Sequence, residues 1–294
     1  MGIEFANAAP RRGLAHELGY LWYRVRQSPL SMAGLTVIVL VLAVMALAGA
    51  LAPYDPNHVD LELRLLPPSA AHWFGTDEVG RDLFSRILYG SRLSVSVALF
   101  VVPVSGTLGS LVGCFSGSIG GKVDMVIMRC TDIVLSVPSL VLTMALAAAL
   151  GPSLFNAMLA ITVVRIPAYV RLARGQALVI RELNYTKAAR AFGGSRWHVV
   201  TWHVLRNAFP PILIQASLDV GNTILMASAL GFIGLGAQQP TAEWGAMVAT
   251  GRNYILDQWW YSAFPGFAIL VTATGCNLFG DGLRDILDPR LKGK

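Results

Sequence analysis

The chain has 294 residues, of which 54% are hydrophobic and only 14% charged, and its mean hydropathy is +0.57. Soluble domains carry about 25% charged residues, so this composition excludes an ordinary soluble fold and indicates a membrane protein. The net charge of +6 is spread between apolar runs rather than gathered on one face of a soluble domain, which excludes a nucleic-acid-binding protein.

Six apolar segments are long enough to cross a membrane, for which about 20 residues are needed. About thirty residues precede the first one, and its apolar run is longer than a signal-peptide core, so we expect it to stay uncleaved. The turn sequence Gly151-Pro152-Ser153 divides one long uncharged stretch into two antiparallel spans. The sequence therefore predicts an all-α polytopic membrane protein, with spans at residues 31–52, 93–117, 125–150, 153–171, 208–234 and 261–280.

The basic residues predict the orientation of these spans. Eighteen of the 23 Lys and Arg residues fall in the tail 1–30, the link 120–130, the stretch 165–206 and the tail 281–294. Short loops rich in Lys and Arg remain in the cytoplasm. We therefore expect both tails in the cytoplasm.

The connector at residues 53–92 is expected on the outer side of the membrane. It has more acidic than basic residues, and its Pro pairs and a Gly-rich turn are typical of an ordered segment. Residues 82–89 could form one short amphipathic helix at the membrane surface. A plain solvated loop is the alternative.

No sequence motif predicts catalysis or metal binding. Cys114, Cys130 and Cys276 lack the spacing of a zinc site or a disulfide framework, and we interpret them as packing residues. Residues 117–124 contain Gly-Lys but lack the first Gly and the Ser/Thr of a P-loop, and neither a nucleophile elbow nor a zinc-protease motif occurs. We expect no catalytic residue, no metal and no cofactor on this chain.

The stretch at residues 174–207 is the one long basic segment between apolar spans. Residues 181–192 are strong helix formers, Gly193-Gly194 ends that helix, and Ser195 is a good N-cap for a second helix that runs through Trp197 and Trp202 toward Pro210. One face of the first helix is expected to carry Tyr185, Ala188, Ala189 and Phe192.

Small residues on that face permit close approach by a partner, and the aromatic residues can fill its pockets. The stretch could therefore dock a protein. It could instead lie on anionic lipid, or it could be an ordinary basic loop without a partner.

The residues 187–193 and 203–211 resemble the EAA loop of the permease subunits of ABC importers. The matching positions are Ala188, Ala189, Gly193, His203, Leu205 and Asn207. Two positions depart from the pattern, because Lys187 stands where the family has Glu and Arg206 where it has Pro. The departure at Lys187 puts in doubt any salt bridge that the Glu would make with the ATPase.

The resemblance extends over nearly the whole chain. "HWFGTDEVGRDLFSRILYGSR", "MRCTDIVLSVPSLVL", "FIGLGAQQPTAEWGAM" and "NLFGDGLRDILDPRLK" all resemble the second permease of dipeptide and oligopeptide importers. "VRIPAYVRLARGQALV" and "GRNYILDQWWY" are most similar to the permease for D,D-dipeptides such as D-Ala-D-Ala. Oligopeptides, glutathione and nickel are handled by related permeases and remain alternative substrates.

The resemblance implies a type I permease fold in the inner membrane of a bacterial cell and a set of partners. A sister permease would complete the pore, two cytoplasmic ATPases would hold ATP and Mg, and a periplasmic or lipid-anchored binding protein would deliver the peptide. Residues 181–207 would act as the coupling loop that contacts one ATPase. The contact residues would be Tyr185, Lys187, Ala188, Ala189, Phe192, Gly193, Ser195 and Trp197.

Asp219 is the one acidic residue deep within a predicted span. It could line the translocation path and meet the ammonium group of the peptide, or it could be a structural hydrogen-bond partner at the subunit interface. Arg165 is interpreted as marking the inner end of the fourth span by snorkelling. The Gly-rich residues 231–236 favour close helix packing over a gate.

Other transport classes lack their usual signals in the sequence. A secondary transporter would need ion-coupling groups in repeated broken helices, and a channel would need a selectivity-filter ring. A pure membrane scaffold is the remaining alternative, and co-purification with an ATPase would distinguish it from an importer subunit.

Overall fold

The structure is a computed structural model that describes residue 23 and residues 25–287. Most of the predicted tail 1–30 and the end of the tail 281–294 lie outside the described residues. The described part is all-α, as predicted, and its one β-bridge joins Thr76 and Asp82. In chain order the elements are α2 (Pro29–Leu51), η1 (Leu61–Leu63), α3 (Leu83–Ile119), α4 (Gly121–Ser136), α5 (Ser139–Leu150), α6 (Leu154–Ile180), α7 (Asn184–Ala191), α8 (Arg196–His198), η2 (Val199–Leu205), α9 (Arg206–Ile233), α10 (Trp244–Gly251), η3 (Arg252–Tyr254) and α11 (Trp260–Leu287).

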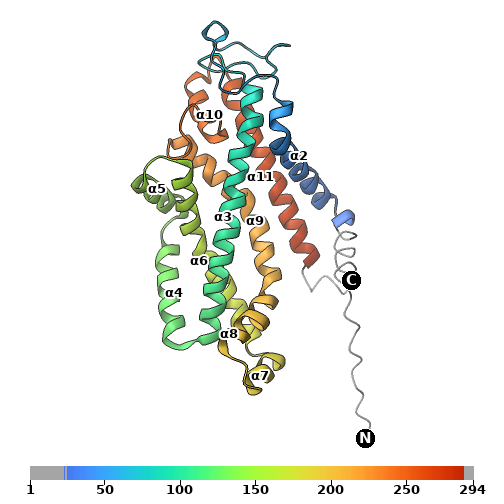
Figure 1. The fold of residues 1–294 in the computed structure, drawn as a ribbon, viewed down its shortest axis with the longest axis vertical. Helices are drawn as coiled ribbons and strands as arrows, with labels where there is room; N and C mark the ends of the chain where they lie inside the picture. Colours follow the sequence, from blue (N-terminus) through green and yellow to red (C-terminus); the bar gives the residue numbers. More distant parts are fainter. Residues whose placement is uncertain (1–22, 24, 288–294) are drawn as a thin grey trace.

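The long helices run along the long axis of the molecule (Figure 1). Among the described residues, five helices are long and apolar enough to cross a membrane, namely α2, α3, α6, the helix from η2 through α9, and α11. The pair α4 and α5 adds a sixth span if it is counted as one crossing. The structure therefore fits the six spans expected from the sequence.

The helix α3 begins ten residues before the predicted span, at Leu83 instead of residue 93. The side chain of Asp82 caps it by accepting a hydrogen bond from the Ser85 backbone N–H at 2.7 Å. Leu83 and Arg86 are buried. The proposed surface helix at 82–89 is thus wrong, and so is the loop alternative, because these residues are the first turns of a buried helix.

The third predicted span, at residues 125–150, is broken. The helix α4 ends at Ser136, Pro138 follows, and α5 leaves at an angle of 92°. A proline removes one backbone N–H and disfavours helical backbone in the residue before it, which explains why the helix stops here. The range 125–150 therefore holds two helices joined at a sharp bend.

The later spans are also longer than predicted. The helix α6 continues to Ile180 instead of ending near residue 171, and α11 continues to Leu287 instead of residue 280. The helix α5 ends at Leu150 and α6 begins at Leu154, on either side of the Gly-Pro-Ser turn. Charged residues ended the apolar runs early in the sequence, whereas the helices continue through them.

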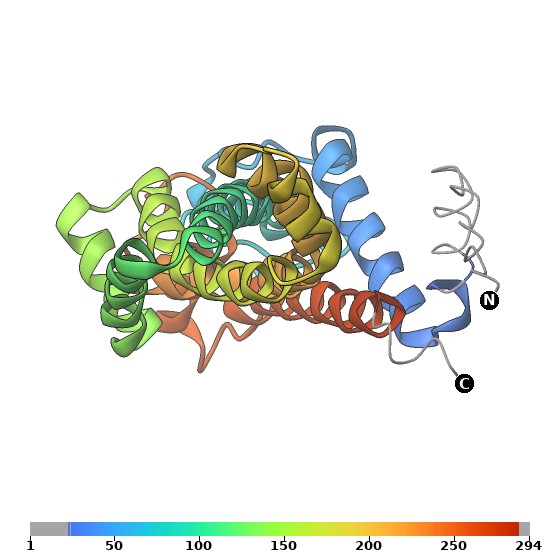
Figure 2. The same ribbon diagram turned by 90° about the horizontal axis from the view of Figure 1, so that it is seen from below.

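The centre of the bundle is the close contact between α3 and α6. Seen along the long axis, α4 and α5 lie to one side and α2 to the other, with α3, α6 and α9 between them (Figure 2). A Cβ added to Gly109 would lie 2.7 Å from the backbone oxygen of Ile166, and one added to Gly113 would lie 2.3 Å from that of Val170. Only glycine permits this approach of two helix backbones.

One end of the molecule is a folded cap, formed by residues 52–82 and 234–259 around the start of α3 (Figure 1). The guanidinium of Arg86 lies inside it with 1% of its surface exposed. It donates hydrogen bonds to the carbonyls of Pro56 at 2.8 Å and Pro240 at 3.2 Å, and its Nε lies 3.5 Å from Asp77. Asp77 also accepts a hydrogen bond from Arg81 Nε at 2.6 Å. Arg86 therefore joins the two segments of the cap.

A second buried acid fixes α10 within the cap. The carboxylate of Glu243 accepts hydrogen bonds from the backbone N–H groups of Gly245 at 2.9 Å and Ala246 at 2.8 Å, and from Ser94 Oγ at 3.2 Å. Its burial raises the pKa of Glu243. A Cβ at Gly231 would lie 2.4 Å from this carboxylate, so Gly231 does serve close packing. Gly234 instead meets open space and ends α9 at a φ of +87°.

Candidate functional site

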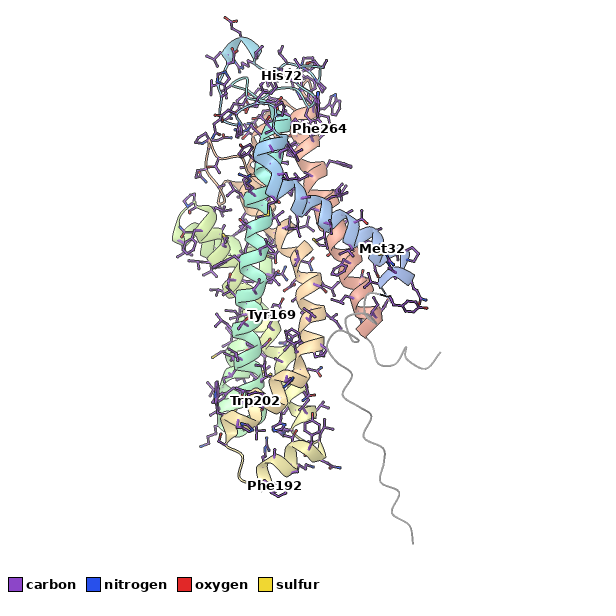
Figure 3. The ribbon with its side chains drawn as sticks, turned by 45° about the vertical axis from the view of Figure 1, so that its right-hand side comes forward. Met32, His72, Tyr169, Phe192, Trp202 and Phe264 are labelled. Carbon is purple, nitrogen blue, oxygen red and sulfur yellow. The ribbon has the colours of Figure 1, made fainter. Side chains whose placement is uncertain are left out.

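The other end of the molecule carries the bent loop, residues 181–207 (Figures 1 and 3). Its first helix, α7, ends at Ala191, and Gly193 follows with a φ of +87°, a conformation that favours glycine. The N–H of Gly194 donates to the carbonyl of Ala189 at 3.0 Å. Ser195 then caps α8, because its Oγ accepts a hydrogen bond from the His198 N–H at 3.2 Å. The two helices and the bend expected from the sequence are both present.

The side chains expected to face a partner lie mostly on the surface. Tyr185, Lys187, Ala188 and Ser195 are exposed, whereas Ala189 is half-buried. Phe192 is 92% exposed and Trp197 60% exposed. Together with Tyr185 they place three exposed aromatic side chains on one short segment, and grouped apolar exposure of this kind marks interaction sites.

Lys187 has a partner within the bent loop itself. Its Nζ lies 3.2 Å from Glu182, and Arg181 Nε lies 3.3 Å from the same carboxylate. The hydrogen bond from Lys187 lowers the pKa of Glu182. The cation that stands at the usual Glu position is therefore matched by an acid five residues earlier in the chain.

The bent loop is anchored in the core by three valines of η2. Val199, Val200 and Val204 are almost fully buried and pack in one cluster with Cys114 of α3 and Tyr169 of α6. The segment then continues without a break into α9. The bent loop is consequently packed against or continuous with α3, α6 and α9.

No feature of the sequence predicted that η2 would be π-helical. The segment Val199–Leu205 has the wider turn of a π-helix, which in proteins occurs frequently at functional sites. Trp202 on this turn is 60% exposed and lies 6.2 Å from the ring of His198. Trp202 therefore extends the aromatic surface of the bent loop beyond the residues predicted.

A buried ion pair lies midway between the two ends. Arg165 Nη1, near the middle of α6, is 3.2 Å from Asp219 Oδ1, halfway along α9. Figure 3 labels Tyr169, one turn from Arg165, midway between His72 of the cap and Phe192 of the bent loop. The snorkelling interpretation of Arg165 is wrong, because α6 continues for four more turns.

The same pair changes the interpretation of Asp219. Its side chain is 2% exposed, and its charged partner belongs to the same chain. A structural partner was one of the two alternatives, but it was expected at the subunit interface. The sequence missed the pairing because the two residues lie 54 positions apart.

The described residues contain no group of three or more His, Cys, Asp or Glu side chains that could hold a metal. The three cysteines are free, with Cys114 and Cys276 buried and Cys130 exposed. The arrangement consists of a surface that can bind a partner at one end and an ion pair between spans in the middle. Both suit binding and movement rather than bond chemistry.

Comparison with known families gives two matches along the chain. Residues 109–293 match the model of the binding-protein-dependent transport system inner membrane component. Residues 18–68 match the N-terminal transmembrane domain of oligopeptide transport permease C. The first match includes the bent loop and both residues of the ion pair.

Several curated proteins are similar over almost the full length. The probable D,D-dipeptide transport system permease protein of Escherichia coli K12 is 66% identical over 99% of this chain and 98% of its own. The dipeptide transport system permease protein of Alkalihalophilus pseudofirmus is 42% identical over 92% of this chain and 88% of its own. The di/tripeptide transport system permease protein of Pseudomonas aeruginosa is 43% identical over 92% of this chain and 91% of its own.

Proposed function

The chain belongs to the family of binding-protein-dependent transport system inner membrane components, with the type I permease fold of ABC importers, and we propose that it imports D,D-dipeptides such as D-Ala-D-Ala. The observation that carries this substrate class is the 66% identity to a D,D-dipeptide permease over 99% of the chain. The general dipeptide permeases reach only 42% and 43%.

The proposal includes the other components of the importer. A sister permease completes the pore, a periplasmic or lipid-anchored binding protein delivers the peptide at the cap, and two cytoplasmic ATPases bind ATP and Mg. This chain holds no cofactor and catalyses no reaction. The distribution of Lys and Arg supports a cytoplasmic bent loop and cytoplasmic termini.

The bent loop is proposed as the contact with one ATPase. The open side chains of Tyr185, Phe192 and Trp197 supply anchors of the kind that dominate protein interfaces. The three valines beneath them connect this contact to α3, α6 and α9. Closing of the ATPase pair would therefore move the spans through the bend at Gly193.

Purification and transport test the proposal together. The tagged chain is expressed together with the other subunits of its importer. It is expected to retain both ATPases after detergent extraction. In proteoliposomes, binding protein loaded with D-Ala-D-Ala should raise ATP turnover and drive uptake of the labelled peptide. Uptake of L,L-dipeptides in preference to D,D-dipeptides would contradict the substrate class, and failure to retain an ATPase would contradict the coupling role.

A further inference from the structure

Three arginines of α6 make ion pairs with neighbouring helices. Arg171 pairs with Asp132 of α4 at 2.8 Å, and Arg174 pairs with Asp124 of α4 at 2.7 Å. Both lie in the half of α6 nearer the bent loop. Arg165 differs from them, because its partner Asp219 belongs to α9 and the pair lies in the middle of both helices.

The two members of this central pair are not equally buried. The side chain of Asp219 is 2% exposed, and its Oδ2 is buried without a hydrogen-bond partner. The side chain of Arg165 is 18% exposed, although its Nε is buried and unbonded. Asp219 is therefore enclosed, while part of the guanidinium reaches the surface of the chain.

Two amide side chains lie on the same helix as Asp219. Gln215 is one turn before it and Asn222 one turn after it, and their separation of seven residues places both on one face of α9. Gln215 is half-buried and Asn222 is exposed. Arg165, Gln215 and Asn222 are here called the mid-span polar face.

A polar face at this depth is costly if it meets lipid. Charged and strongly polar groups inside a membrane face the interior of a bundle or a water-filled path, and they often mark the path of a substrate. An arginine offers five N–H donors in a fixed fork, which suits a carboxylate held by two hydrogen bonds. The contact of the pair joins Nη1 to Asp219, and Nε makes no hydrogen bond.

We propose that Arg165, held in place by Asp219, is the site at which this subunit binds the carboxylate of the peptide during its passage. The inference rests on the proposed function, and it reverses the polarity expected from the sequence, in which Asp219 itself would meet the ammonium group. Asp219 is a positioning residue that orients the guanidinium. It also balances the charge, so that a carboxylate binds weakly enough to leave again.

The test uses the complete importer in proteoliposomes with saturating binding protein and labelled D-Ala-D-Ala. The measured quantity is peptide taken up per ATP hydrolysed. Arg165→Gln is expected to lower it by about tenfold or more, since a charged donor is lost at the site, while ATP turnover stays within about twofold. Arg165→Lys keeps the positive charge but loses the planar set of N–H donors. Its uptake per ATP should lie between those of the wild type and Arg165→Gln.

The matched control is Arg171→Gln. It removes the same kind of side chain from the same helix and breaks an ion pair whose members are both about half exposed. Such pairs contribute little, so uptake per ATP should remain within about twofold of the wild type. A drop as large as that of Arg165→Gln would show that any arginine of α6 has the same effect and would overturn the proposal.

Two double variants separate binding from a purely structural role. Arg165→Asp with Asp219→Arg restores an ion pair between α6 and α9, and Arg165→Gln with Asp219→Asn replaces it by two amides. Both are expected to assemble with the other subunits and to keep uptake per ATP low, because neither presents a guanidinium from α6. Recovery of uptake in either variant would overturn the carboxylate site.

Failure of this inference can be told apart from failure of the proposed function. If the wild-type importer takes up the dipeptide and Arg165→Gln takes it up equally well per ATP, only the site is wrong. If the wild type shows no uptake of the dipeptide that depends on the binding protein, the proposed substrate class is wrong and the site is wrong with it.

Discussion

The cap and the bent loop differ in how many of their polar and aromatic side chains find partners within the chain. In the cap, Arg86 is 1% exposed and bonds to two separate segments of the chain, and Glu243 accepts three hydrogen bonds. In the bent loop, Phe192 is 92% exposed and Lys187 pairs only with a neighbouring residue.

This difference separates residues needed for folding from residues available for binding. Leaving a buried charge without its partner costs several kcal/mol of folding free energy. The cap therefore depends on its own internal ion pairs and hydrogen bonds to keep its structure. An exposed aromatic side chain adds nothing to the fold until a partner covers it. We therefore expect substitutions in the cap to change stability and substitutions in the bent loop to change assembly.

The largest effect is expected in the cap, from Arg86→Gln. The substitution removes a buried cation that bonds to the carbonyls of Pro56 and Pro240 and is one of the two arginines beside Asp77. Asp77 keeps Arg81, and the loss of the buried guanidinium should cost about 3–5 kcal/mol of unfolding free energy. Thermal unfolding of the purified protein in detergent measures it. Arg92→Gln is the control, because Arg92 is half-buried and lies over the Tyr89 ring at 5.1 Å, and its loss should cost about 1 kcal/mol or less. Equal losses would contradict the special role of the cap.

The next effect concerns assembly. Phe192→Ala combined with Trp197→Ala should weaken ATPase binding by about 2–4 kcal/mol while the unfolding temperature of the isolated subunit stays within about 2 °C. Binding of the ATPase to the immobilised permease measures the first quantity. Trp73→Ala in the cap, which removes an equally exposed tryptophan, should leave ATPase binding unchanged. A loss of stability without a loss of binding would show that the two ends do not differ as described.

A smaller effect is expected at the bend. Gly193→Ala should cost about 1–2 kcal/mol, because an L-residue is strained at a φ of +87° although the space around it is open. Gly175→Ala in α6 is the matched control. A Cβ added there also meets open space, but the backbone is helical, so alanine should be neutral or stabilising. Chemical denaturation of both variants measures the difference, and equal behaviour would exclude backbone strain at the bend.

The smallest effect is the pH dependence of the pair between Glu182 and Lys187. The pKa of Glu182 is lowered below its usual 4.5 by Lys187, so the stability that the pair contributes is present above pH 4.5 and disappears as the pH falls through the lowered pKa. Comparing the unfolding temperatures of wild type and Lys187→Gln from pH 7 to pH 3 should therefore show two curves that converge in acid. Curves that converge instead as the pH rises would reverse the assigned sign.

Much of the bent loop could be predicted because its signals are local. Gly193 and Ser195 act within three residues of their own positions, so a bend and a cap can be inferred without knowing the fold. The start of α3 could not be predicted in this way. Arg92 bounded the apolar run in the sequence, and Arg86, whose partners at Pro56, Asp77 and Pro240 meet it only after folding, lay outside that run.

The ion pair of Arg165 and Asp219 escaped prediction for the same reason. Each residue was noticed as an unusual charge, but nothing in the sequence indicates that the middle of α6 lies beside the middle of α9. The break at Pro138 was overlooked because hydropathy measures apolar length and takes no account of a missing backbone donor.

The contact between α3 and α6 limits which parts of the chain can rearrange. Where Gly109 and Gly113 bring the two backbones together, backbone atoms and Cβ atoms of α6 fill the contact and leave little room for sliding. We therefore expect spectroscopic labels on α3 and α6 to keep their separation throughout a transport cycle. Any opening within this chain must then occur at helices with sparser packing, and α4 and α5, with only Asp124, Thr131, Thr143 and Ala147 buried, are the hinged flank on which such movement would fall.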